Sequence, residues 1–189
     1  MPRLIKLSDG RPQWADDGFL FLEDGQPSPA PGFGSANGVI ISLARFQAER
    51  EAWLSSGRRL GVRLEPHEAV EDIAEELPHL VLVALVFPKF RDGRPYSAAA
   101  LLRERYGFKG EIRAVGEVLR DQADFMIRCG FDAYEPADGS TPEDWNRAEH
   151  RFRHVYQAAA DDVSPAFRER ATSPSPRANP IQTESSEWG

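Results

Sequence analysis

Short apolar runs separated by amphipathic stretches dominate the middle of this chain. Residues 39–43 and 80–87 are almost entirely apolar, and runs of this length suit buried strands, since a membrane span needs about 20 apolar residues. Between these runs, Val70, Ile73 and Leu77 recur at the spacing of a helix face. This alternation predicts an α/β domain, in which strands and helices follow one another along the chain.

The pattern predicts five strands, which cover residues 39–43, 59–64, 80–87, 111–115 and 131–135. It predicts helices between them, over residues 45–56, 68–77, 97–107 and 119–129. Strands that are joined through helices pair in parallel, with right-handed crossovers. We therefore expect a mostly parallel five-stranded sheet with helices on both faces. A partial barrel is the alternative, because strand order cannot be read from a single sequence.

The two ends of the chain differ from this middle part. Residues 3–7 and 18–22 look extended, with Asp-Gly turn signals near their ends, and predict a small N-terminal hairpin. A last helix is predicted after Ser140 or Thr141, either of which can cap it. Towards the C-terminus the apolar pattern fades into a segment rich in serine and proline. These features divide the chain into an N-terminal hairpin and linker (1–38), a single α/β domain (39–160) and a mostly disordered tail (161–189).

Composition and charge exclude several classes of protein. The chain has 189 residues and a net charge of -7 at pH 7, which is unsuited to general nucleic-acid binding. Its single cysteine, Cys129, allows no intramolecular disulfide, iron–sulfur cluster or cysteine-rich zinc site, and we expect no metal. The sequence shows neither an apolar membrane span nor a secretion signal, so we expect a cytoplasmic protein without a membrane partner.

Two charged loops that contain glycine form the candidate site. Residues 88–94 follow the apolar strand 80–87, and residues 115–122 follow the next predicted strand. In a parallel sheet the carboxyl ends of the strands meet at one edge, where α/β folds place their sites. We therefore expect the two loops to lie together.

The residue types in these loops suit the binding of an oxyanion. Arg91 and Arg94 each offer paired guanidinium donors, which match phosphate, sulfate or carboxylate, and Ser97 is expected to cap the following helix. The predicted ligand-binding residues are Lys89, Arg91, Gly93, Arg94, Ser97, Gly116, Arg120 and Gln122. The alternative is a structural Asp-Gly turn whose arginines pair with acids on neighbouring helices.

Three acidic residues of the same loops are candidates for proton transfer, namely Asp92, Glu117 and Asp121. Burial of such a carboxyl raises its pKa toward neutral, as a general acid or base requires. The alternative is that Glu117 and Asp121 only favour the first turn of a helix. Arg120 can pair with Asp121, or with Asp92 across the cleft.

A string of motifs through both loops resembles a bacterial family. The motifs are Phe87-Pro88-Lys89-Phe90-x-Asp92-Gly93-Arg94-x-Tyr96-Ser97, Arg105-Tyr106-Gly107-Phe108, Val118-Leu119-Arg120-Asp121-Gln122 and Arg128-Cys129-Gly130-Phe131-Asp132-Ala133. Over residues 39–160 the chain is similar to an uncharacterised domain-of-unknown-function family, often labelled oxidoreductases and encoded beside an assimilatory sulfite (or nitrite) reductase. The resemblance implies a role near sulfite reduction, with sulfite reductase as the partner. It supplies no established catalytic residue.

Two functions of different class remain open. In the first, the protein is an accessory factor of sulfite reductase, or an oxidoreductase acting with it, in assimilatory sulfate or sulfite reduction. In the second, it is a small enzyme that binds an anion or a phosphate-bearing ligand and uses a carboxylate as acid or base. An oxidoreductase needs a cofactor, but the sequence has no dinucleotide fingerprint and no flavin signature. The cofactor is therefore unassigned.

Overall fold

The computed structural model describes residues 4–27 and 38–149. Eight strands lie in this part of the chain: β1 (Leu4–Ser8), β2 (Arg11–Ala15), β3 (Phe19–Leu22), β4 (Gly38–Ser42), β5 (Arg59–Leu64), β6 (Leu80–Phe87), β7 (Glu111–Val118) and β8 (Ala133–Pro136). The same residues form five α-helices: α1 (Leu43–Ala48), α2 (Arg50–Ser55), α3 (Arg94–Ala100), α4 (Ala123–Arg128) and α5 (Pro142–Glu149). The same residues also contain four short helical turns: η1 (Val70–Ile73), η2 (Leu77–His79), η3 (Leu101–Arg105) and η4 (Arg120–Gln122).

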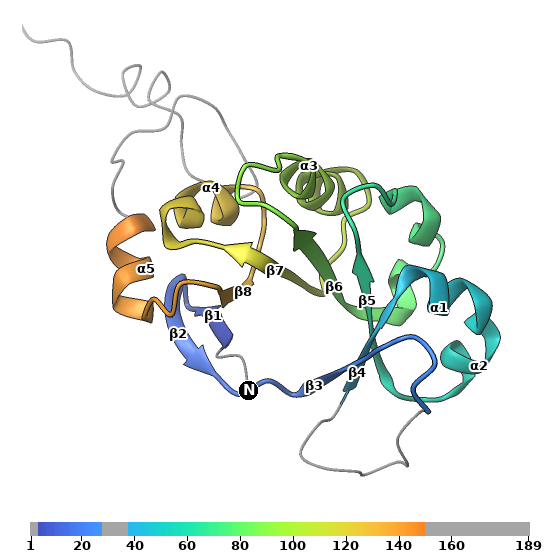
Figure 1. Cartoon of the computed structure of the whole chain (residues 1–189). Coiled ribbons are helices and arrows are strands. Elements are labelled where there is room, and N and C mark those ends of the chain that lie inside the picture. The colour runs from blue at the N-terminus through green and yellow to red at the C-terminus, as the bar shows by residue number, and fades with distance from the viewer. Residues whose placement is uncertain (1–3, 28–37, 150–189) are drawn as a thin grey trace, which may run out of the picture.

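All eight strands form one mixed sheet, in the order β2-β1-β8-β7-β6-β5-β4-β3. Strands β3 to β8 run parallel to one another, whereas β1 pairs antiparallel with both β2 and β8. The sheet curls into a half-barrel, and the helices lie around its convex side (Figure 1). The expectation of a mostly parallel five-stranded sheet is therefore wrong, and the alternative of a partial barrel fits.

The strands missing from the prediction lie at the edges of the sheet. β1 and β2 form the N-terminal hairpin, which turns at Asp9 and Gly10, both with positive φ. β2 has the sequence Arg-Pro-Gln-Trp-Ala, and this polar composition hid it from the pattern. Its proline is tolerated because β2 is an edge strand. The predicted second strand of the hairpin, residues 18–22, instead forms β3 at the opposite edge, parallel to β4.

The described helices pack against one face of the sheet. In β6, Val83, Leu85 and Phe87 belong to the main core, which also contains buried residues from every described α-helix. The alternate residues Leu82 and Ala84 belong to a small cluster on the other face, and that cluster contains strand residues only. The expectation of helices on both faces is therefore wrong for the described part of the chain.

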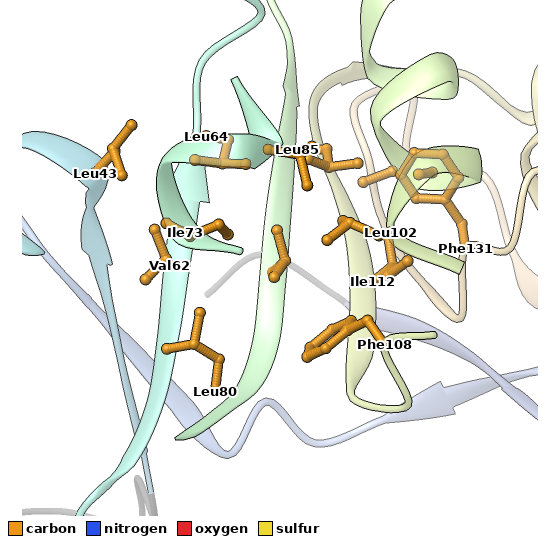
Figure 2. Packing of buried hydrophobic residues seen from close by; sticks show 14 of the residues in the cluster. Leu43, Val62, Leu64, Ile73, Leu80, Leu85, Leu102, Phe108, Ile112 and Phe131 are labelled. Carbon is orange, nitrogen blue, oxygen red and sulfur yellow. The ribbon is translucent and has the colours of Figure 1, made fainter. Parts of the chain in front are cut away.

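The main core joins strands and helical turns into one packed layer (Figure 2). Val62 and Ile112 come from the strands on either side of β6, and Ile73 and Leu102 pack over the sheet beside them. All four side chains are fully buried, and each such burial stabilises the fold by roughly 1.5–3 kcal/mol. Ile73 lies in η1, because short turns replace the α-helix that was expected over residues 68–77.

Helix α5 begins where the sequence predicted. The Thr141 hydroxyl accepts the backbone N–H of Asp144 (3.3 Å), and the Asp144 carboxylate accepts the backbone N–H of Thr141 (3.0 Å). This reciprocal cap satisfies backbone donors that the helix itself cannot pair. Trp145 is buried and donates its indole N–H to the Ser140 hydroxyl (2.7 Å). The predicted continuation of this helix and the predicted tail lie outside the described residues.

Candidate functional site at the carboxyl edge of the sheet

The loops that follow β6 and β7 meet at the carboxyl edge of the sheet, as predicted. Phe87 and Gly116 are neighbours in the parallel pairing of the two strands. Beyond them, the backbone N–H of Phe90 donates to Glu117 Oε2 (3.1 Å), and the Phe90 carbonyl accepts a bond from Gln122 Nε2 (2.5 Å). Side chains of the second loop thus bind both polar backbone groups of one residue in the first loop.

The Asp92 carboxylate pairs with two of the three nitrogen atoms of the Arg94 guanidinium. Nε of Arg94 donates to Asp92 Oδ1 (2.9 Å) and Nη2 donates to Oδ2 (2.6 Å). Hydrogen bonding to Arg94 keeps the pKa of the Asp92 carboxyl below its usual range, and the pKa of Arg94 is raised in turn. Asp92 also accepts the backbone N–H of Arg94 (3.1 Å), where α3 begins. The expectation that Ser97 caps this helix is wrong, because Ser97 lies exposed inside α3.

Lys89, Arg91 and Gly93 are exposed on the first loop. The guanidinium carbon of Arg91 lies 5.3 Å from the centroid of the Phe90 ring, which is a cation–π distance. Gly93 has a φ of -84°, and a Cβ at this position would meet no atom within 4 Å. The loop therefore needs no glycine there for its own conformation.

Gly116 is the glycine that the site requires. Its φ is +96°, and a Cβ at this position would collide with the carbonyl oxygen of Phe87. The next residue, Glu117, lies within β7, so its position is not explained by the first turn of a helix. Gly116 thus lets the backbones of β6 and β7 approach closely at the point where the two loops meet.

Arg120 points to α5 and not to the first loop. Its Nη1 lies 3.9 Å from Asp144 Oδ1, and among the described residues no ion pair joins it to Asp121 or Asp92. Arg120 is half-exposed and Asp121 is exposed on η4. The structure therefore brings Glu117 and Gln122 to the first loop and directs Arg120 elsewhere.

Aromatic rings connect the loops to the core. The Tyr96 ring centroid lies 5.1 Å from that of Phe87 and 4.7 Å from that of Phe125. Burial raises the pKa of the Tyr96 phenol to about 12, although its hydrogen bond with Gln122 acts in the opposite direction. Phe90 and Phe125 keep 44% and 53% of their surface exposed. We define the rim surface as Lys89, Phe90, Arg91 and Phe125.

A cavity of about 150 Å³ opens between β5, β6 and α3. Leu64, Val70 and Leu85 contribute apolar walls, and Arg94 and Ser97 are also among the lining residues. Two of the residues predicted to bind a ligand thus border one cavity at the carboxyl edge of the sheet. The remaining predicted residues do not line it.

Sequence reasoning missed a buried charged cluster on the concave face of the sheet. Arg113 in β7 is fully buried, with Nε 2.8 Å from Glu111 and Nη1 2.9 Å from Asp17 and 3.3 Å from Glu135. Its guanidinium carbon lies 5.6 Å from the centroid of the Phe19 ring. Asp17 lies between β2 and β3, so this ion pair ties the N-terminal segment to β7.

Burial opposes the charge of Arg113, but its bond to Asp17 and the charge of Glu111 outweigh burial and raise its pKa. Burial also raises the pKa of the Glu135 carboxyl. A permanently charged guanidinium among carboxylates is a structural tie and not a proton donor. The sequence signal of this cluster was the pair of charged residues Glu111 and Arg113. They are two positions apart and therefore lie on the same face of a strand.

In the part of the chain that the structure describes, no three His, Cys, Asp or Glu side chains are grouped so as to hold a metal ion. None of the helices in residues 4–27 and 38–149 has the length and apolar character to span a bilayer. Cys129 ends α4 and packs, partly buried, against the main core.

The fold and the rim surface define an α/β half-barrel protein whose exposed loops gather at the carboxyl edge of its sheet. A family model described as a bacterial protein of unknown function (DUF934) matches residues 61–167, which is more than half of the chain. The protein therefore belongs to this family, as the motifs through both loops indicated. A search of the curated proteins finds no match.

Proposed function

We propose that this protein is an accessory factor of assimilatory sulfite reduction that docks on sulfite reductase through its rim surface. The pathway rests on the resemblance carried by the motifs through both loops. The docking rests on one observation: Phe90 is held by both of its backbone polar groups and still exposes 44% of its surface. Exposed aromatic residues on a rigid backbone are typical anchors of protein interfaces, since little entropy is lost when they are buried.

The charge of the rim surface favours an acidic partner. Lys89 and Arg91 are exposed cations, and the charge of nearby Arg94 is already balanced by Asp92. This local positive charge stands on a chain whose net charge is -7. Opposite charge on the partner would steer the two proteins together and fix their orientation.

The contacts of the acidic residues favour docking over proton transfer. Asp92 has a lowered pKa because of Arg94, so it stays ionised near neutral pH and is a weak base. One carboxylate oxygen of Glu117 accepts a hydrogen bond from the backbone N–H of Phe90. Both groups thus organise the loops, which is the task of a binding surface. A second function as a proton-transfer enzyme has no comparable contact in its favour.

The proposed pathway is tested by growth. Deletion of the gene, in a host without a paralogue, should impair growth on sulfate or sulfite, and sulfide or cysteine should restore it. Complementation with Phe90→Ser should fail, whereas Phe21→Ser should restore growth, because Phe21 is a similarly exposed phenylalanine outside the rim surface (38%). Normal growth of the deletion strain on sulfate would refute the pathway assignment.

A further inference from the structure

The cavity between β5, β6 and α3 combines an apolar interior with a charged mouth. Leu64 and Leu85 are neighbours in the pairing of β5 with β6 and lie side by side in the core view (Figure 2). Together with Val70 they are buried, so they form the inner walls. The cavity and its mouth together measure about 150 Å³, a volume that holds a small molecule of roughly the size of benzene.

Acidic, basic and polar residues border the mouth of this cavity. Glu65 and Glu68 follow β5, and Arg94 and Ser97 lie on the first turn of α3. Arg94 and Ser97 are exposed, and both acids are partly exposed, so these four residues face the solvent side. Of the two acids at the mouth, Glu65 is paired with Arg63. No ion pair involves Glu68 among the described residues.

Two of these residues are already held in place by the protein. Oε2 of Glu68 accepts the backbone N–H of Glu65 (2.7 Å). Arg94 gives Nε and Nη2 to Asp92, and a guanidinium carries five N–H donors, so Nη1 is left over. A fixed cation and a fixed anion thus each keep an unused polar edge, which lowers the entropy lost when a ligand binds.

We propose that this cavity binds a free α-amino acid with an unbranched or branched aliphatic or thioether side chain, of the size of leucine or methionine. The side chain fills the apolar interior. The carboxylate accepts bonds from Arg94 Nη1 and the Ser97 hydroxyl, and the ammonium group donates to Glu68. A zwitterionic head offers acceptors to the donors of Arg94 and Ser97 and donors to Glu68, which a simple carboxylic acid or amine cannot do. This site is independent of the proposed docking on sulfite reductase.

Calorimetric titration of the full chain with L-leucine and L-methionine tests this proposal. Saturable binding of at least one of them is expected. Aspartate and lysine should not bind. The single-headed analogues 4-methylpentanoate and 3-methylbutylamine should bind at least about tenfold more weakly, since each loses one charged hydrogen-bonding partner. Absence of saturable binding by both amino acids would overturn the proposal, and equal binding of 4-methylpentanoate and leucine would overturn the zwitterion assignment.

Matched variants on α3 locate the binding. Ala98→Leu adds bulk to a lining residue and should abolish binding, whereas Ala100→Leu adds the same bulk to a residue that does not line the cavity and should leave affinity unchanged. Arg94→Gln should weaken binding by about ten- to a hundredfold, which is the loss of one charged hydrogen bond. Thermal melts of each variant confirm that it is folded. Unchanged affinity in both Ala98→Leu and Arg94→Gln would refute this site.

Discussion

Burial makes the Tyr96 phenol harder to deprotonate. Its ring packs against Phe87 and Phe125, and burial raises the pKa of its phenol from 10.0 to about 12. The folded protein therefore keeps a proton that the unfolded chain releases, and this contribution to stability is lost as the pH rises from 10.0 to about 12.

Titration of tyrosinate absorbance checks this shift. The folded protein should show an ionisation step near pH 12 that comes from Tyr96, and this contribution should be absent in Tyr96→Phe. A control variant, Tyr106→Phe, should retain the step. Loss of a step near pH 10 in Tyr96→Phe would contradict the burial of this phenol.

At the residue scale the sequence named the loops correctly but not the partners of their side chains. Arg94 and Arg91 looked alike, yet one pairs with Asp92 and the other packs on Phe90. A guanidinium uses the same donors for a ligand and for a neighbouring carboxylate, so composition cannot separate the two. Gly93 and Gly116 also looked alike, and only the backbone conformation shows that Gly116 is the one required.

At the scale of elements, the geometry of β7 positions both loops, and Gly116 is its critical residue. Gly116→Ala would force a side chain into the left-handed region and against the Phe87 carbonyl, so it should cost about 1–3 kcal/mol of unfolding free energy. Gly93→Ala is the matched control, in open space and with ordinary φ, and should change stability by less than about 0.5 kcal/mol. Urea unfolding measures both, and equal effects of the two variants would contradict this account of the loop.

The elements that the sequence predicted well are those with continuous burial. β5 and β6 match residues 59–64 and 80–87, because apolar strands in the interior of a sheet leave an unambiguous pattern. The predicted helix over residues 68–77 was wrong. Proline at positions 66 and 78 brackets this stretch, and the short turns η1 and η2 bury its apolar residues Val70, Ile73 and Leu77. β2 was missed because a polar edge strand carries little hydrophobic signal.

At the scale of the whole molecule, Arg113 connects segments that are 96 positions apart in the chain. Arg113→Leu would leave the carboxylates of Asp17 and Glu135 without their cation and Glu111 with Lys6 alone, and breaking a buried ion pair in this way costs about 3–5 kcal/mol. Arg120→Gln removes an exposed arginine 3.9 Å from its acid and should cost less than about 1 kcal/mol. Urea unfolding compares the two, and a cost below about 1 kcal/mol for Arg113→Leu would show that the cluster is not a structural tie.

The shape of the whole molecule lay beyond the sequence for a physical reason. Alternating strands and helices determine local pairing, and β4 to β8 follow that rule. The half-barrel also includes edge strands and contacts such as Asp17 with Arg113, whose partners no local pattern identifies. The two candidate loops could still be placed together, because parallel strands bring their carboxyl ends to one edge in a flat sheet and in a curved one alike.

Direct binding of the purified protein to purified sulfite reductase from the same host tests the central claim most directly. Wild type should bind, and Phe90→Ser should weaken binding about thirtyfold, the effect of losing an aromatic anchor worth ~2 kcal/mol. Phe21 is an exposed phenylalanine that packs against Arg63, outside the rim surface. The variant Phe21→Ser should therefore bind like wild type. No binding by wild type, or equal binding by wild type and Phe90→Ser, would contradict the proposal that the rim surface docks on the reductase.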